Sequence, residues 1–298
     1  MNLNLRAKGT FLAIIGTMLW GISGTVAQFL FQNKGFNPEW LVVIRLLLSG
    51  TILLLYGYIR SDKDIKTIWK SRRNRIDLLL FSILGMLGVQ YTYFAAISHG
   101  NASTATILQY LSPVIITCYL IIKNKKLPSS QQIFAISLAM IGTFFIITKG
   151  NIHSLSLSKA ALFWGVCSAI CAAIYTLQPI SLLKQFSSTA VIGWGMLIGG
   201  LFFSFINPPF NFIGIWSTSS ILSLIFIVIF GTIIAFYCYL ESLKYLIPID
   251  ASILSCVEPL SATFLSAIWL NTLFGLAEFT GIICVIVAVI TLSFTNRQ

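Results

Sequence analysis

The sequence predicts an all-α polytopic membrane protein whose ten transmembrane helices form two inverted five-helix repeats. Three observations lead to this prediction: an apolar composition, ten apolar segments of membrane-spanning length, and a repeat that relates the two halves of the chain. Of the 298 residues, 57% are hydrophobic and only 9% are charged, whereas soluble domains carry about 25% charged residues. The composition therefore excludes a soluble protein.

The ten apolar segments account for almost the whole chain. A helix needs about 20 residues to cross the hydrocarbon core of a bilayer. Polar and turn-forming residues separate the segments, which we place at 9–31, 38–59, 77–98, 101–122, 131–148, 159–178, 189–206, 219–243, 249–270 and 275–294. Too little chain remains for a soluble catalytic or nucleic-acid-binding domain.

Basic residues are distributed unevenly between the loops. With ten spans and the N-terminus inside, fifteen Lys and Arg residues face the cytoplasm, and only Lys34, Lys149 and Lys159 face outward. Because basic residues concentrate in cytoplasmic loops, we expect a multi-pass cell-membrane protein with both termini in the cytoplasm. The net charge of +11 then reflects loops that face anionic lipid, and no nucleic-acid partner is expected.

An internal repeat relates the two halves of the chain at an offset of 146 residues. Residues 93–96 correspond to 239–242, 105–108 to 251–254, and 111–113 to 257–259. Since each half has an odd number of crossings, the second half is inverted relative to the first. We therefore divide the chain into repeats 1–150 and 151–298. Such inverted repeats are common in secondary transporters, whose sites lie between the repeats near the membrane midplane.

Several short motifs, in this order and spacing, resemble the EamA-type transporters of the drug/metabolite transporter superfamily. They are Gly16-Thr17-Met18-Leu19-Trp20-Gly21, Arg45, Gln109-Tyr110-Leu111-Ser112-Pro113 and Glu258-Pro259-Leu260. The family often has a Glu at the start of the fifth and tenth spans, where this chain has Gln132 and Glu278. The resemblance implies a secondary transporter, commonly an exporter of amino acids, related metabolites or drugs, although some relatives import.

Polar and aromatic side chains recur along one face of the first, third, fourth, sixth, eighth and ninth spans. Polar groups at mid-span are costly in lipid and tend to face the bundle interior. We therefore predict a cavity between these spans that suits a small amphipathic solute. Its predicted residues are Trp20, Gln28, Gln90, Tyr91, Gln109, Pro113, Tyr175, Gln178, Tyr237, Ser255, Glu258 and Pro259. Packing alone is the alternative role for Trp20 and Tyr175.

Pro113 and Pro259 stand at equivalent depths in the two halves. A proline within a helix frees the carbonyl four residues earlier and kinks the helix. The freed carbonyls are those of Gln109 and Ser255. Symmetric kinks of this kind point to a transport site, or they serve packing alone.

Glu258 and Arg45 are the charged residues expected within the membrane. A charge at that depth is costly unless it is neutralised, paired or wetted. Glu258 is our candidate for energy coupling: it would exchange a proton, hold a substrate ammonium group, or serve a structural role. Arg45 would reach the outer surface, bind a carboxylate, or pair within the bundle.

The string Gly21-Ile22-Ser23-Gly24 offers an alternative function, because intramembrane serine proteases carry a similar Gly-x-Ser-Gly motif. Those enzymes pair the serine with a histidine on another helix, but His99 and His153 both fall in predicted loops. A protease also leaves the repeat unexplained. With no metal-ligand cluster in the sequence, we expect a transporter that acts without a cofactor or a metal, on a small-molecule substrate in a lipid bilayer.

Overall fold

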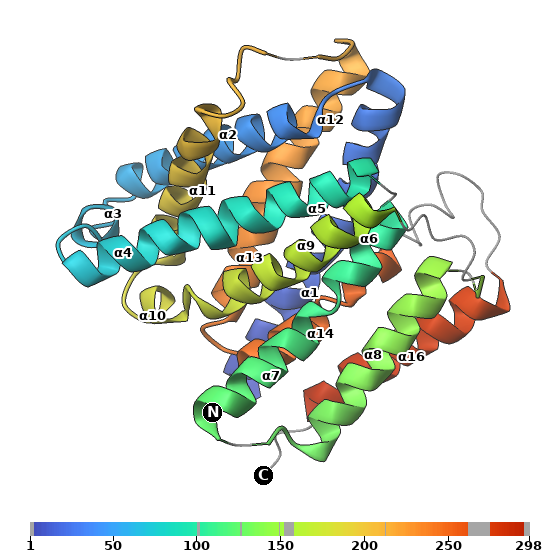
Figure 1. Ribbon diagram of the computed structural model, residues 1–298. Coiled ribbons are helices and arrows are strands. Elements are labelled where there is room, and N and C mark those ends of the chain that lie inside the picture. The colour runs from blue at the N-terminus through green and yellow to red at the C-terminus, as the bar shows by residue number, and fades with distance from the viewer. Residues whose placement is uncertain are drawn as a thin grey trace.

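The computed structural model describes residues 3–99, 102–125, 127–148, 150–151, 158–211, 213–261 and 275–294. Within these ranges the chain forms helices joined by turns, without a strand. Figure 1 shows the helices gathered into one bundle, with the start of α1 and the end of α16 at the same end of the molecule. The predicted all-α class is therefore confirmed.

The first half contains the five predicted spans as continuous or broken helices. They are α1 (Leu3–Lys34), α2 (Pro38–Ile59), the run of α4 (Arg72–Leu80), η1 (Phe81–Leu87) and α5 (Gly88–His99), the pair α6 (Ala102–Gln109) and α7 (Ser112–Asn124), and α8 (Ser130–Thr148). The short helix α3 (Asp64–Thr67) lies between α2 and α4. Asn37 begins α2, because its side chain accepts a hydrogen bond from the backbone N–H of Trp40 at 2.9 Å.

The second half repeats this order. It contains α9 (Lys159–Leu177), α11 (Ser188–Ser204), the run of α12 (Thr218–Val228), η3 (Ile229–Ile234) and α13 (Ala235–Ser242), then α14 (Pro248–Leu254) and α16 (Leu276–Phe294). The short helix α10 (Ile180–Leu183) follows α9, and residues 257–261 form a further helical turn after α14. The rest of the predicted ninth span, 262–270, lies outside the described residues.

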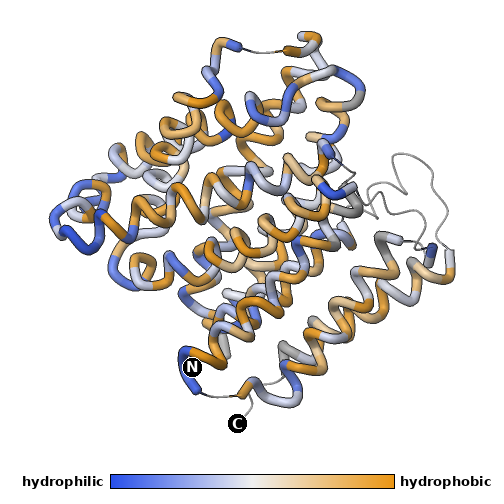
Figure 2. Tube along the Cα trace, viewed as in Figure 1, coloured by the Kyte–Doolittle hydropathy of each residue, from blue (hydrophilic) through white to orange (hydrophobic). Residues whose placement is uncertain are grey.

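The helices have the length and composition of membrane spans. Those long and apolar enough to cross a bilayer are Leu5–Phe31, Pro38–Ile59, Arg72–His99, Lys159–Leu183 and Thr218–Ser242, and shorter apolar helices cover Ser112–Asn124, Ser130–Phe145, Ser188–Ser204 and Phe279–Ala288. Together they occupy every predicted span except the partly described ninth. Figure 2 shows hydrophobic residues along the helices and hydrophilic ones gathered mainly at their ends. The chain is therefore a polytopic membrane protein.

The helix packing follows the predicted repeat. Helix α2 packs along α11, and α8 packs along α16, so these spans contact their own counterparts. Helix α1 packs along α13, so the first span of the first half contacts the third span of the second half. Helix α5 packs along α9, which is the same contact with the halves exchanged. The π-helices η1 and η3 occupy corresponding parts of the third and eighth spans. The two halves are thus built alike and related by a two-fold exchange.

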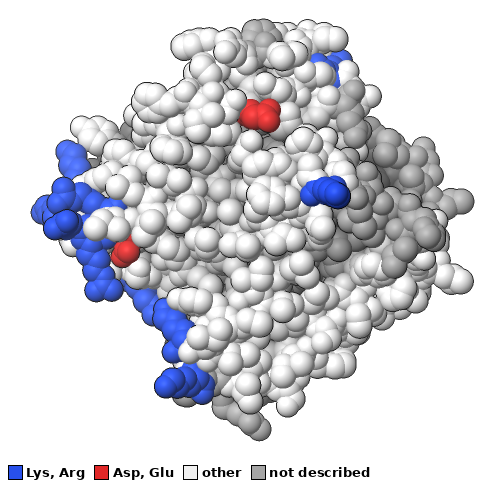
Figure 3. Space-filling view, viewed as in Figure 1, with Lys and Arg blue, Asp and Glu red and all other residues white. Residues whose placement is uncertain are grey.

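Basic side chains gather at one end of the bundle. Figure 3 shows Lys and Arg along the edge that carries α3, α4 and the end of α7. The connection from α2 to α4 carries Arg60, Lys63, Lys66 and Lys70, and the start of α4 adds Arg72, Arg73 and Arg75. This is the end that we predict to face the cytoplasm.

Candidate functional site

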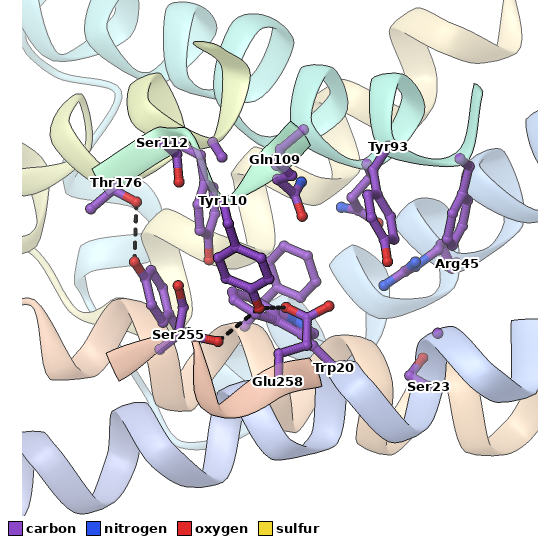
Figure 4. A pocket seen from close by; sticks show the side chains of 18 residues that line it. Trp20, Ser23, Arg45, Tyr93, Gln109, Tyr110, Ser112, Thr176, Ser255 and Glu258 are labelled. Atoms are coloured by element: carbon purple, nitrogen blue, oxygen red, sulfur yellow. Dashed lines mark hydrogen bonds between the residues drawn. The ribbon is translucent and has the colours of Figure 1, made fainter. Parts of the chain in front are cut away.

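A cavity lies between the two halves, in the interior of the bundle. Helix α2 contributes to it in addition to the six spans predicted from the sequence. The lining residues are Trp20, Ser23, Gly24, Arg45, Val89, Gln90, Tyr93, Phe94, Gln109, Tyr110, Ser112, Ala172, Tyr175, Thr176, Phe236, Tyr239, Ser255 and Glu258. Figure 4 shows side chains from several helices pointing into this common space.

Repeat-related positions line the cavity in pairs. At the offset of 146 residues the pairs are Gln90 with Phe236, Tyr93 with Tyr239, Gln109 with Ser255, and Ser112 with Glu258. Each half therefore supplies the same structural positions: one pair is identical, Tyr93 with Tyr239, and the other three differ in chemistry. The second half carries a carboxylate at the position where the first half carries a hydroxyl.

Half of the predicted cavity residues line this space, namely Trp20, Gln90, Gln109, Tyr175, Ser255 and Glu258. The other predicted residues, Gln28, Tyr91, Pro113, Gln178, Tyr237 and Pro259, are not among its lining residues. Their placement has simple geometric reasons. Gln28 lies one turn beyond Gly24 in α1, and Gln178 at the end of α9 donates to the carbonyl oxygen of Asp77 at 2.6 Å.

Tyr91 and Tyr237 lie on helix faces that point away from the cavity. Successive residues of an α-helix point about 100° apart, so a residue next to a lining position faces elsewhere. Tyr91 follows Gln90 and packs against Trp164 and Phe203, with ring centroids at 5.4 and 4.8 Å. Tyr237 follows Phe236 and packs on the apolar core.

The prolines shape the helices that line the cavity. Pro113 lies in the first turn of α7, directly after the break that ends α6 at Gln109. In the ninth span, Pro259 has no N–H to offer the carbonyl oxygen of Ser255. That oxygen instead accepts hydrogen bonds from the backbone N–H of Glu258 at 2.9 Å and from the Tyr110 hydroxyl at 2.8 Å. The carbonyl oxygen of Ser255 therefore lacks its regular i+4 donor and accepts from these two groups instead.

Tyr93 and Tyr239, which belong to the polar and aromatic stripes predicted for the third and eighth spans, also line the cavity. Other lining residues were absent from the predicted set, notably Tyr110, Ser112 and Thr176. One signal in the sequence indicates one of them. Ser112 is the repeat counterpart of Glu258, so the offset alone selects it once Glu258 is a candidate.

Glu258 lies at the junction of the halves, with 9% of its surface exposed. The hydroxyl of Tyr110 donates to its Oε2 atom at 3.2 Å, and Figure 4 shows the carboxylate directed toward the cavity. Among the described residues, no basic side chain lies within the 4.0 Å of an ion pair with this carboxylate. Glu258 is therefore held by a hydroxyl rather than by a counter-ion.

Arg45 reaches the same cavity from α2, with 5% of its surface exposed. Its Nε donates to Thr232 Oγ1 at 3.0 Å, and its Nη2 donates to the carbonyl oxygen of Gly231 at 3.2 Å. Both partners belong to the π-helix η3. The guanidinium carbon also lies 5.3 Å from the ring centroid of Phe94 and 5.8 Å from that of Phe236, which is cation–π range.

Aromatic rings form one wall of the cavity. The Trp20 ring lies 4.9 Å from that of Phe236 and 5.0 Å from that of Tyr239, and Tyr175 stacks on Tyr239 at 5.8 Å. The Tyr239 hydroxyl shares a hydrogen bond of 3.2 Å with Thr176. Within the described part of the chain, Trp20 Nε1 and the Tyr175 hydroxyl have no hydrogen-bond partner. This wall can therefore contact an apolar body and still offer polar atoms to a solute.

Ser23, the serine of the protease-like string, packs against η3. A Cβ atom added at Gly231 would lie 2.4 Å from the Cβ of Ser23, so the two helices touch at this point. His99 is the last residue of α5 and is not among the lining residues, and His153 lies outside the described residues. Ser23 thus marks a close helix contact beside the cavity.

Both halves of the chain match one family of membrane proteins. Residues 7–148 and 159–294 each match the model of the EamA-like transporter family. The chain therefore belongs to the EamA-like transporter family, and it is a membrane transporter rather than an enzyme.

Individual relatives are similar over nearly their whole length. The chain is 39% identical over 295 residues to the "uncharacterized inner membrane transporter YicL" of Salmonella typhimurium, covering 98% of this chain and 97% of that protein. It is 23% identical over 311 residues to an "uncharacterized transporter" of Clostridium kluyveri, covering 98% and 94%. A crystal structure with 15% identity superposes with a TM-score of 0.80 over 98% of this chain and 99% of that one, which shows a shared fold.

Proposed function

We propose that the protein is a secondary transporter that exports a small metabolite, an amino acid or a related amphipathic solute, across the cytoplasmic membrane by alternating access. The observation that carries this proposal is the cavity lined by repeat-related pairs such as Ser112 and Glu258. A site shared by two similar halves is exposed to one side or the other when the halves rock about it. The repeats 1–150 and 151–298 are the moving units in this account.

Contacts across the halves at the basic end support this picture. Arg6 forms an ion pair with Asp250 at 3.2 Å, and Gln132 donates to the other carboxylate oxygen of Asp250 at 3.3 Å. Lys8 donates to the Tyr245 hydroxyl at 3.1 Å. These contacts join α1 and α8 of the first half to the second half, and they would separate when the cavity opens toward the basic end.

The chemistry of the cavity supports an amphipathic solute. Trp20, Phe236 and Tyr239 offer an apolar wall, whereas Gln90, Gln109 and Glu258 offer polar groups. Small-molecule sites commonly combine a mostly apolar lining with a few polar groups that fix orientation. In our proposal Glu258 is also the coupling residue, which exchanges a proton or holds a substrate ammonium group as the site changes sides.

The proposal is tested by a thermal-shift screen of the purified protein against amino acids, amines, nucleosides and sugars, followed by exchange of each hit in proteoliposomes. A solute that binds the native state raises the unfolding temperature by mass action. We expect at least one amino acid or related solute to be both bound and exchanged. Binding and exchange confined to nucleosides or sugars would contradict the proposed substrate class.

A variant pair at Gly24 links transport to the cavity itself. The nearest atom to a Cβ atom at this glycine is the Tyr93 hydroxyl oxygen, at 3.9 Å, so the space beside it is open. We expect Gly24→Leu to fill the cavity and abolish exchange while the protein stays folded. Gly24→Ala is the matched control and should retain exchange. Normal exchange by Gly24→Leu would place the transport site elsewhere.

A further inference from the structure

The proposed export of an amphipathic solute does not assign a role to the guanidinium of Arg45. Of the five N–H donors of a guanidinium, only Nε and one hydrogen of Nη2 have hydrogen-bond partners among the described residues, namely Thr232 and Gly231. In the described part of the chain, no carboxylate lies within 4.0 Å of Arg45. A cation is thus buried beside the cavity without a direct counter-ion.

Such a cation is unfavourable unless something neutralises it. Burial removes the water that would solvate the charge, and both partners of Arg45 are neutral oxygens, which compensate it only in part. Glu258 lines the same cavity, where the Tyr110 hydroxyl lies 3.2 Å from its Oε2 atom, but its carboxylate makes no ion pair with Arg45. A negative charge in direct contact with the guanidinium would therefore have to lie in the cavity itself.

The surroundings of Arg45 hold the guanidinium in one orientation. Thr232 and Gly231 fix its edge to the π-helix η3, and the rings of Phe94 and Phe236 lie beside it. Both rings also line the cavity. The other N–H groups, on Nη1 and Nη2, form the kind of fork that binds the two oxygens of a carboxylate.

Gln90 provides a second, independent indication of a missing ligand. Its side chain has 4% of its surface exposed and lines the cavity, and its Oε1 atom has no hydrogen-bond partner among the described residues. The Tyr175 hydroxyl, also in the lining, is in the same state. Buried polar atoms without partners are rare in folded proteins and call for an explanation. A polar solute between the halves supplies one.

We propose that Arg45 binds a carboxylate group of the transported solute and so determines specificity: solutes with a carboxylate are accepted, and purely cationic or neutral ones are rejected. This inference rests on the proposed transport function and narrows its substrate class. The carboxylate lies at the Arg45 side of the cavity, and the apolar body of the solute lies against Trp20, Phe236 and Tyr239.

Probes that share a body but differ in their charged end test this inference directly. The first set is phenylalanine, phenylalaninamide, phenethylamine and 3-phenylpropionate, and the second is the corresponding leucine series. Affinities are measured by calorimetric titration of the purified wild-type protein, Arg45→Gln and Arg45→Lys. In at least one set, the wild type should bind the carboxylates about tenfold or more tighter than the amide and the amine, as charge-assisted hydrogen bonds allow.

The variants identify Arg45 as the source of that preference. Arg45→Gln should bring the affinity ratio of carboxylate to amide close to one, and Arg45→Lys should keep part of it because the charge remains but the fork is lost. Thr232→Val keeps the guanidinium and removes one of its two hydrogen-bond acceptors, so it should weaken the preference without abolishing it. If Arg45→Gln does not fold, the Lys and Val variants carry the test.

Two results would overturn the inference. The first is a wild type without a carboxylate preference in either set. The second is an undiminished preference in the variants, either in Arg45→Gln or in both Arg45→Lys and Thr232→Val. If amines or amides are bound and exchanged as well as carboxylates, the transport proposal stands and only the role of Arg45 fails. If proteoliposomes exchange no solute of any class, both the proposed transport function and the role of Arg45 fail.

Discussion

The hydroxyl of Tyr110 donates a hydrogen bond to the carboxylate of Glu258 at 3.2 Å and so joins the break in the fourth span to the break in the ninth. The same hydroxyl lies 2.8 Å from the carbonyl oxygen of Ser255. The two breaks are repeat counterparts, since α6 ends at Gln109 and α14 ends at Leu254. The cavity is therefore crossed by a contact between the halves that any rocking motion has to change.

The first prediction concerns this contact. Tyr110→Phe removes the hydroxyl and keeps the ring, so Glu258 Oε2 and the Ser255 carbonyl oxygen lose the single O–H donor that they share. We expect the free energy of unfolding to fall by about 1–3 kcal/mol and solute exchange in proteoliposomes to slow. Tyr91→Phe is the control, because that ring lies outside the cavity, and it should behave as the wild type. Wild-type exchange by Tyr110→Phe would show that the contact is dispensable.

The second prediction concerns the two prolines. Pro259→Ala supplies a backbone N–H that can donate to the carbonyl oxygen of Ser255 and compete with Tyr110 for it. Pro113→Ala supplies the equivalent N–H in the first half, where the acceptor is the carbonyl oxygen of Gln109. We expect both variants to insert normally but to transport more slowly, as measured by initial rates in proteoliposomes. If both variants transport at the wild-type rate, the kinks serve packing alone.

The third prediction compares two glycines on α1. A Cβ atom at Gly21 would lie 2.3 Å from the carbonyl oxygen of Glu258 and 2.2 Å from Ser261 Oγ, whereas Gly24 has open space. Gly21→Ala should therefore push α1 away from the ninth span and cost about 1–3 kcal/mol of stability. Gly24→Ala should leave the unfolding temperature nearly unchanged. Equal unfolding temperatures for the two variants would contradict the close approach of α1 to the ninth span.

The fourth prediction concerns the orientation in the membrane. With both termini in the cytoplasm, a single cysteine at Asn151 on a cysteine-free background should react with an impermeant thiol reagent in intact cells. A cysteine at Asn74, in the basic end of the bundle, should react only after permeabilisation. Labelling of both positions from the same side would show that the ten-span topology is wrong.

The fold was predictable from the sequence because its signals are long and redundant. Apolar segments, basic loops and the offset of 146 residues each constrain the same arrangement, and an error of a few residues at a boundary changes little. The breaks in the fourth and ninth spans followed from Pro113 and Pro259, since a proline in the middle of a span lacks the N–H that would continue the helical hydrogen bonds.

The cavity was only partly predictable, because a lining residue is defined by its direction as well as its position along the helix. Tyr91 and Gln90 are neighbours in sequence, yet they face different helices. The π-helix η1 adds a further change of register before these residues, and periodicity at 3.6 residues does not anticipate it. The bonds of Arg45 to η3 depend on the same local geometry.

Transport driven by a pH gradient in proteoliposomes containing Glu258→Gln shows whether Glu258 is the coupling residue. Glutamine keeps the shape and hydrogen bonding of Glu258 but cannot exchange a proton, and a carboxylate at this depth is costly unless it has such a function or a partner. We expect gradient-driven transport to be lost while solute exchange is retained. Transport at the wild-type rate with an unchanged pH profile would show that Glu258 neither carries the proton nor binds a cation, and would contradict the account.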